Sequence, residues 1–220
     1  MSRILKFGRK AAASGRARSL VVFVHGYGAN GADLLDIAEV LAPHLPDTAF
    51  AAPDAADRIP GAPFGHQWFP IPRFDGSSEA QAAAGLERAA VDINAFVDQR
   101  LAYEGLGPEA LAFVGFSQGA MMSLHVAPRR EVAPAAVVAI SGRLIQPERL
   151  AGEATAKPPM LIMHGDQDQV VDFEEMALAA NALVAAGFDT YGHVMKGMGH
   201  GISQDGLASM LGFLKQFLPG

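Results

Sequence analysis

A serine stands between two glycines in the stretch Gly115-Phe116-Ser117-Gln118-Gly119. An apolar run precedes this stretch and a helical pattern follows it, so it matches G-x-S-x-G in the strand-to-helix context that the motif requires. A hydroxyl on so tight a turn can act as a nucleophile, and glycines on either side leave room for the neighbouring strand and helix. The backbone N–H of Gln118, at the start of the helix, would face a developing oxyanion. We therefore interpret Ser117 as a nucleophile rather than an incidental serine in a glycine-rich connection.

A serine hydroxyl needs a histidine to accept its proton and a carboxylate to orient that histidine. On a scaffold of this kind the chain order is serine, acid, histidine. Two histidines, His193 and His200, follow both Ser117 and the two aspartates at 166 and 168 that are candidate acids. His193 alternates with its neighbours in a strand pattern, whereas His200 lies in a glycine-rich loop after the last expected strand. The sequence therefore predicts His200 as the base.

Two aspartates, Asp166 and Asp168, directly follow an apolar strand and compete for the role of the acid. The residues alone give only a modest preference for Asp168, because the later position has more freedom to reach the imidazole. A second oxyanion donor is expected in the early loop 25–28, where we predict that the backbone N–H of Tyr27 pairs with that of Gln118. We interpret His25 in that loop as a brace rather than a reacting group.

The surrounding elements must bring these residues to one place. Short apolar runs alternate with helical patterns, which predicts an α/β fold with a parallel sheet covered on both faces. Strands are expected at 19–26, 48–55, 111–116, 135–142, 158–165 and 189–197, and helices at 29–45, 77–105, 118–127, 173–188 and 203–218. Asn30 or Asp33 can cap the first helix. Ligands in such sheets bind at the carboxyl ends of the strands, where the candidate residues follow.

The first 18 residues contain six basic residues and no acid. We expect this segment to form a cationic edge hairpin, with residues 4–7 pairing near 20–24 around Ser14-Gly15, and we treat a transit peptide as the alternative. No linker, repeat or low-complexity tail divides the chain, so residues 1–220 are expected to form a single domain in which 1–18 is an N-terminal edge hairpin or arm.

Composition excludes several classes of protein. The 220 residues carry a formal charge of −6, which does not fit a nucleic-acid binder, and no apolar run approaches the length of a transmembrane segment. The absence of cysteine excludes disulfides, thiolate metal sites and a cysteine nucleophile. No H-x-H or H-E-x-x-H spacing occurs, so we expect neither a metal nor another cofactor. We expect the protein to be cytoplasmic.

Four motifs occur in order along the chain, namely H-G-Y-G at 25–28, G-F-S-Q-G-A at 115–120, H-G-x-x-D-x-x-V at 164–171 and G-x-G-H at 197–200. Together they resemble the carboxylesterase/phospholipase family of α/β-hydrolases, which includes the acyl-protein thioesterases, over nearly the whole chain. The resemblance implies the α/β-hydrolase fold, with a mostly parallel central sheet and helices on both faces. It also implies Ser117 as nucleophile, Asp168 as acid and His200 as base, with the amides of Tyr27 and Gln118 as oxyanion donors.

Two positions depart from the family pattern. Tyr27 stands where many relatives have Leu, which preserves the amide donor but changes the neighbouring side chain. Pro70 follows Trp68-Phe69 where relatives often have Asp. Since that stretch borders the acyl site in the family, the substrate preference does not carry over with it.

We expect a serine hydrolase that cleaves small carboxylic esters of short to medium acyl chains through an acyl-enzyme. The irregular segment 58–76, about 19 residues long, is too short for a large lid domain. Its aromatic residues Phe64, Trp68 and Phe69, with Ile71, either line an apolar acyl groove or pin the segment to the core. Alternatives are a thioesterase acting on S-acylated proteins or small thioesters, and a non-catalytic binding module of the same fold. A homodimer is left open.

Overall fold

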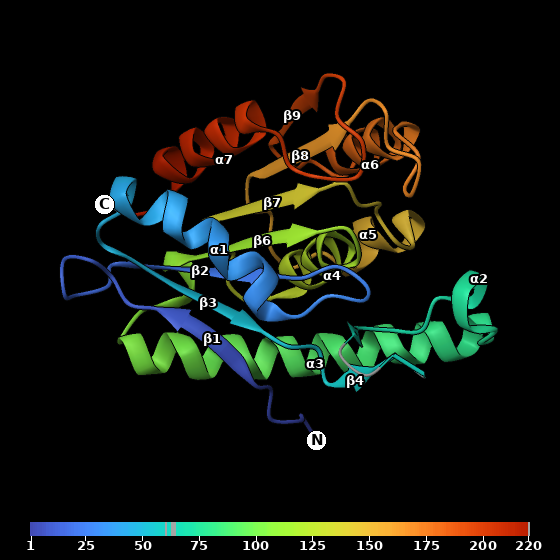
Figure 1. Ribbon diagram of the computed structural model, residues 1–220, viewed down its shortest axis with the longest axis horizontal. Helices are drawn as coiled ribbons and strands as arrows, with labels where there is room; N and C mark the ends of the chain where they lie inside the picture. The colour runs from blue at the N-terminus through green and yellow to red at the C-terminus, as the bar shows by residue number, and fades with distance from the viewer. Residues whose placement is uncertain (60, 63–64, 220) are drawn as a thin grey trace.

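A seven-stranded sheet forms the centre of the computed structural model, which describes residues 1–59, 61–62 and 65–219 (Figure 1). The strands follow the order β1-β3-β2-β6-β7-β8-β9, and all of them run parallel except β1, which is antiparallel to its neighbour. Their bounds are Phe7–Lys10 for β1, Ser19–Val24 for β2, Thr48–Pro53 for β3, Leu111–Phe116 for β6, Ala136–Ile140 for β7, Met160–Gly165 for β8 and Thr190–Met195 for β9. A short ribbon pairs β4 (Asp57–Arg58) with β5 (His66–Gln67).

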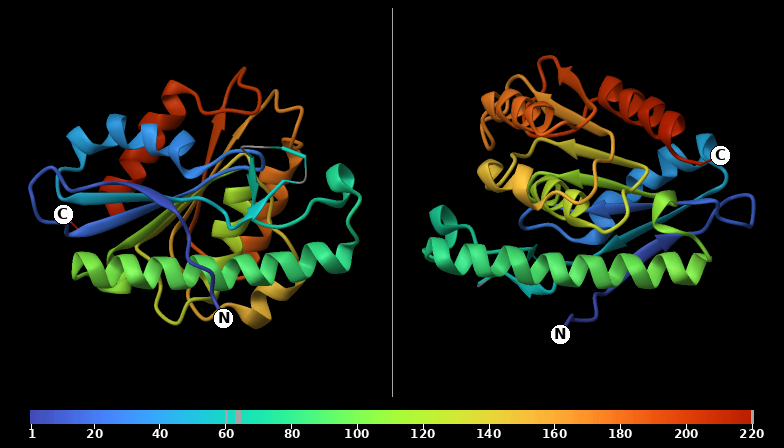
Figure 2. Two further views of the ribbon diagram at one scale, coloured as in Figure 1. Left: turned by 60° about the horizontal axis from the view of Figure 1, so that its bottom comes forward. Right: turned by 180° about the vertical axis from the view of Figure 1, so that it is seen from behind.

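Helices cover both faces of this sheet, as the alternation of patterns predicts (Figures 1 and 2). The two helices α1 (Gly31–Leu41) and α7 (Gln204–Phe217) pack their apolar side chains into one core layer. The other layer is formed with α3 (Glu79–Glu104), α4 (Gln118–Val126), α5 (Pro147–Glu153) and α6 (Glu174–Ala185). Strands buried on both faces need the continuous apolar runs found in the sequence. The α/β-hydrolase architecture expected from the sequence is therefore confirmed.

Helix ends follow the capping signals. Asn30 caps α1 by accepting the N–H of Ala32, and Asp33 accepts the N–H of Asn30 in return, so both predicted residues take part. Ser78 caps α3 in the same reciprocal way with Gln81, and Gly105 ends that helix with a left-handed φ of 69°. These caps fix the loops that leave the carboxyl ends of β2 and β3.

The N-terminal segment corrects one prediction. Strand β1 lies at the sheet edge, but it pairs with β3, from Phe7 opposite Pro53 to Lys10 opposite Phe50, and not with 20–24. Strand β2 already bonds β3 on one side and β6 on the other, so no edge of it remains for the N-terminal strand. Some of the basic residues also have acidic partners: Arg3 binds the buried Asp92, and Lys10 contacts Glu39.

Two short helices lie outside the predicted elements. Helix α5 opens with Pro147 at its first position, a signal that the sequence reading did not use. Helix α2 (Pro72–Asp75) forms inside the irregular segment and lies near the start of α3, beyond the carboxyl ends of the strands (Figure 1). Single turns of 3₁₀ helix lie at Ala42–His44, Pro108–Ala110 and Ala127–Arg129. Among the described residues, no helix has the length and apolarity needed to cross a bilayer.

Candidate active site

The turn between β6 and α4 holds Ser117 in a backbone conformation that side chains rarely adopt, with φ 54° and ψ −117°. The flanking glycines make this turn sterically feasible. A Cβ on Gly115 would collide with the backbone of Gly119, and a Cβ on Gly119 would collide with the carbonyl of Val24 at the end of β2. The N–H of Ser117 is held by the carbonyl of Ile140 at 2.8 Å. The close contacts at the two glycines and the bond to Ile140 therefore fix the backbone conformation of Ser117.

Asp168 lies in the turn after β8 and contacts His200. The Nδ1 of His200 is 2.7 Å from Asp168 Oδ2, and the other carboxylate oxygen accepts the N–H groups of Val170 and Val171 at 2.8 and 3.0 Å. Burial raises the pKa of Asp168, but the hydrogen bonds from His200, Val171 and Val170 outweigh it and bring the pKa below its usual value. The carboxylate is therefore ionised at neutral pH and can fix the proton of His200 on Nδ1.

The second aspartate has a different task. Asp166 Oδ1 accepts the N–H of Gly197 at 2.7 Å, which ties the turn after β8 to the loop that carries His200. Asp166 therefore braces the loop and does not contact the imidazole. The other late histidine, His193, lies in β9 and contacts Asp205 at 2.9 Å, at the start of α7. The structure thus brings His200, and not His193, together with Asp168.

The imidazole of His200 packs beside the serine turn. Its ring centroid is 4.9 Å from that of Phe116, the residue before Ser117, and both His200 and Ser117 line one cleft of about 660 Å³. Tyr27 and Gln118 also line this cleft. Four of the predicted residues thus surround one space at the carboxyl ends of the strands.

His25 holds the early loop through both ring nitrogens. Nε2 accepts the N–H of Ala55 at 3.0 Å, so the proton lies on Nδ1, which donates to the carbonyl of Gly26 at 2.7 Å. Complete burial lowers the pKa of His25 and keeps the ring neutral. Because the Gly26 carbonyl and the Tyr27 N–H belong to one trans peptide, fixing the first also aims the second. His25 is therefore a brace, as predicted.

The two predicted oxyanion donors are backbone groups. Gln118 is the first residue of α4, where an N–H has no acceptor within the helix. Across residues 1–59, 61–62 and 65–219, no hydrogen bond engages the N–H of Tyr27 either. Both groups border the cleft and are available to a negative oxygen.

The side chain of Gln118 joins the turn to the irregular segment, a role that the sequence reading missed. Its Oε1 accepts the N–H of Trp68 at 2.9 Å and its Nε2 donates to the carbonyl of Phe69 at 2.8 Å, with the amide almost completely buried. The indole N–H of Trp68 donates in turn to the carbonyl of His25 at 2.9 Å. A glutamine directly after the serine was the available signal.

These bonds correct the prediction for Trp68. Its side chain is 1 % exposed and lies within the core layer, so it supports the segment from behind and does not line the cleft. Phe69 does line the cleft, together with Ile71. Phe64 lies outside the described residues. Further apolar lining comes from residues that include Leu86, Met121, Ile145 and Val171.

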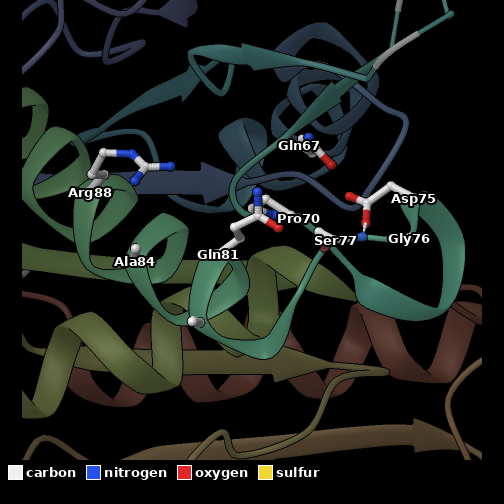
Figure 3. A pocket seen from close by; sticks show the side chains of 9 residues that line it. Gln67, Pro70, Asp75, Gly76, Ser77, Gln81, Ala84 and Arg88 are labelled. Atoms are coloured by element: carbon white, nitrogen blue, oxygen red, sulfur yellow. Dashed lines mark hydrogen bonds between the residues drawn. The ribbon is translucent and has the colours of Figure 1, made fainter.

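A second hollow, of about 700 Å³, lies on the other side of Pro70, which borders both spaces. Figure 3 shows Asp75 and Arg88 at opposite ends of this hollow. The Asp75 carboxylate already accepts the N–H groups of Ile71 and Ser77, and none of the described residues around the hollow is a histidine. This space therefore lacks an acid–base pair for a nucleophile, and the cleft at Ser117 is the candidate active site.

Among the described residues, no cluster of three or more His, Asp or Glu side chains is placed to hold a metal ion.

Comparisons with known proteins agree with the geometry. A family model described as phospholipase/carboxylesterase matches residues 10–218. The chain is 29 % identical over 203 residues to the esterase YpfH of Escherichia coli K12, covering 92 % of this chain and 84 % of that protein. It is 25 % identical over 228 residues to acyl-protein thioesterase 1 of Gibberella zeae, covering 94 % of each. The crystal structure of esterase PE8 is 40 % identical, covers 97 % of this chain and 99 % of its own, and superposes with a TM-score of 0.92.

Proposed function

Because this chain belongs to the phospholipase/carboxylesterase family of α/β-hydrolases, we propose that it is a serine esterase with Ser117, His200 and Asp168 as its catalytic triad. The observation that carries the proposal is the 2.7 Å contact from His200 Nδ1 to Asp168, made at the edge of the cleft that Ser117 also lines. The strained backbone of Ser117 supports the same assignment, since strain of this kind is concentrated at functional sites.

The reaction follows from these positions. Since Asp168 holds the Nδ1 proton, His200 Nε2 is left to accept the proton of Ser117 as Oγ attacks the acyl carbonyl. The backbone N–H groups of Tyr27 and Gln118 stabilise the oxyanion of the tetrahedral intermediate. The C–O bond of the ester then breaks, the alcohol leaves with the proton from Nε2, and Ser117 keeps the acyl group. Water repeats the sequence and releases the carboxylic acid.

The acyl group is assigned to the apolar part of the cleft, lined by Phe69, Ile71, Leu86 and Met121. We propose short to medium acyl chains, because residues 69–74 of the irregular segment line the cleft and are held to the turn by Gln118. Burial and the neighbouring Asp75 carboxylate raise the pKa of the Tyr27 phenol, so this chain presents a neutral hydroxyl where many relatives have leucine.

Thioester cleavage is the second candidate, and the likeness to acyl-protein thioesterase 1 of Gibberella zeae favours it. The same triad serves both reactions, since only the leaving atom differs. Turnover on an ester and a thioester with identical acyl groups separates the two. A kcat/KM at least tenfold higher on the thioester would make thioesterase the better description.

A fluorophosphonate probe tests the nucleophile directly. The wild-type protein should be labelled on Ser117, as located by peptide mass spectrometry, and Ser117→Ala should not be labelled. Ser123→Ala is the matched control, because Ser123 is a buried serine of α4, the helix that follows Ser117. Its hydroxyl donates to the Gly119 carbonyl. Labelling of Ser117→Ala at the wild-type rate would contradict the assignment.

A further inference from the structure

A second imidazole lies against the carboxylate of Asp168. His164 is the next-to-last residue of β8, and its side chain is completely buried. Its Nε2 is 3.0 Å from the carbonyl of Val171 and 3.3 Å from Asp168 Oδ2. This is the same carboxylate oxygen that His200 contacts at 2.7 Å. Two imidazoles thus approach one oxygen from different elements.

The neighbours of His164 decide where its proton lies. A carbonyl and an ionised carboxylate are both acceptors, so Nε2 must carry the proton and donate it. The hydrogen bond goes to Val171, and Asp168 Oδ2 lies 3.3 Å from the same nitrogen, close enough for the N–H dipole to act on the carboxylate. In a neutral ring, Nδ1 is then unprotonated, and it has no partner among the described residues.

This contact closes the turn that presents the carboxylate. Asp168 Oδ1 accepts the N–H groups of Val170 and Val171, while the carbonyl of Val171 accepts His164 Nε2. The peptide chain between residues 164 and 171 is therefore bonded to itself at both ends, with Asp168 in the middle. Rotation of the carboxylate away from His200 would break the two bonds to Oδ1.

We propose that His164 is a positioning residue for catalysis, which holds Oδ2 of Asp168 toward His200 and reduces the negative charge on that oxygen. The inference rests on the proposed function, because it acts through the triad. His164 does not touch substrate: it is absent from the cleft lining, and the ring of Phe173, at 6.1 Å between centroids, packs beside it. Among the described residues, Asp168 is the charged group that contacts the imidazole.

Two substitutions separate positioning from packing. His164→Met keeps the apolar volume and removes the donor, whereas His164→Gln keeps an N–H donor near the place of Nε2. We expect His164→Met to lower kcat about 10- to 100-fold with KM within threefold, because the bond that holds Val171 and the N–H dipole beside Oδ2 are both lost. His164→Gln should recover kcat to within a few-fold of wild type.

The pH profile gives a readout that a purely structural role would not move. With the His164 donor removed, Oδ2 carries more negative charge and stabilises protonated His200 more strongly. The acid limb of kcat/KM should therefore move to higher pH in His164→Met, by about half a unit to one unit, and stay at the wild-type position in His164→Gln. Equal kcat and an unmoved limb in His164→Met would overturn the proposal, as would equal losses in both variants.

The wild-type protein supplies a test that needs no substitution. Histidine ¹⁵N NMR at neutral pH should show the proton of His164 on Nε2, and its signals should shift when a fluorophosphonate modifies Ser117. A proton on Nδ1 of His164 would overturn the proposal even if both variants fail to fold. Failure of the wild-type protein to react with the probe would instead reject the esterase assignment, and the two failures are distinguishable.

Discussion

The serine turn and residues 69–74 of the irregular segment line the same cleft, and different interactions hold them in place. At the turn, backbone atoms meet backbone atoms: the positions of Gly115 and Gly119 admit no side chain, and Ser117 is left with one conformation. At Trp68 and Phe69, side chains hold the irregular segment, namely the amide of Gln118 and the indole of Trp68. Backbone sterics tolerate almost no substitution, whereas side-chain hydrogen bonds can be exchanged at a cost of about 1 kcal/mol each.

This difference separates reaction from selection. The atoms proposed to react or to stabilise charge come from the turn after β6, the start of α4 and the loops that follow β2, β8 and β9. The wall that meets the acyl group comes from a segment with few backbone hydrogen bonds to the sheet. We therefore expect substitutions at the turn to remove turnover, and substitutions in the segment to change which substrate is preferred.

The largest expected effect is at the turn itself. Ser117→Ala should reduce kcat by about 10⁴- to 10⁶-fold, because the remaining groups only bind the substrate and the oxyanion. The melting temperature should stay within a few degrees of wild type, because the backbone contacts at Gly115 and Gly119 fix the turn and the Ser117 hydroxyl does not. Residual turnover within tenfold of wild type would end the distinction between the two regions.

The two aspartates after β8 give the next largest effect. Asp168→Asn should lower kcat by about 10⁴-fold, because an amide favours the wrong tautomer of His200. Asp166→Asn should keep kcat within about threefold and lower the free energy of unfolding by about 1 kcal/mol, since it weakens the bond to the Gly197 N–H. Turnover and thermal unfolding of both variants are measured side by side. The reverse pattern would assign the acid to Asp166.

The amide of Gln118 belongs to both regions, so its removal measures their coupling. Gln118→Met keeps the backbone donor but loses the side-chain bonds to Trp68 and Phe69. We expect kcat/KM to fall about 10-fold and the free energy of unfolding to fall by about 2 kcal/mol. Gln81→Met is the control, because that glutamine caps α3 outside the cleft. An unchanged kcat/KM in Gln118→Met would show that the wall is held without the turn.

Selection should depend on Phe69 and not on the tryptophan beside it. Phe69→Ala enlarges the apolar part of the cleft and should shift the preferred acyl chain to longer esters, with relative kcat/KM changing about tenfold across the series. Trp68→Phe should lower stability and leave the shape of that series unchanged, because the indole is buried behind the wall. A profile that moves only in Trp68→Phe would reverse these roles.

The smallest effect on turnover is expected outside both regions, at His125 in α4. Burial, followed by the positive charges of Arg129 and Arg149, lowers the pKa of His125 to about 4. Since the unfolded value is about 6.5, the unfolded chain binds more protons between these two values. The free energy of unfolding should therefore fall as the pH drops from about 6.5 to about 4, by on the order of 2 kcal/mol. His125→Leu should flatten that dependence in chemical denaturation and keep kcat at neutral pH.

The sequence predicts the turn and its partners well because steric rules are local. A serine between glycines, a histidine in a glycine-rich loop and an aspartate after a buried strand each follow from a few adjacent residues. The contact between His200 and Asp168 joins positions 32 residues apart, yet the order of the motifs anticipates it. The sheet order was less accessible, since the displacement of β1 onto β3 depends on which strand edges remain free.

The wall of the cleft was hardest to predict for the opposite reason. Trp68 and Phe69 are adjacent aromatic residues, and no local rule says which one faces the cleft. That choice depends on the Gln118 side chain, 50 residues away from Trp68, and on the carbonyl of His25. Long-range hydrogen bonds of this kind leave no periodic mark in the chain.

The buried indole gives this protein an optical reporter at a useful place. Trp68 is the single tryptophan of the chain, and it packs against His25 at 5.0 Å between ring centroids while bonded through its backbone to Gln118. Its fluorescence therefore arises from one site, shielded from solvent and joined to the loops on both sides of the proposed oxyanion donors. Acylation of Ser117 can be followed through the fluorescence of Trp68 by stopped flow. No chromogenic leaving group is needed, so natural esters can be used.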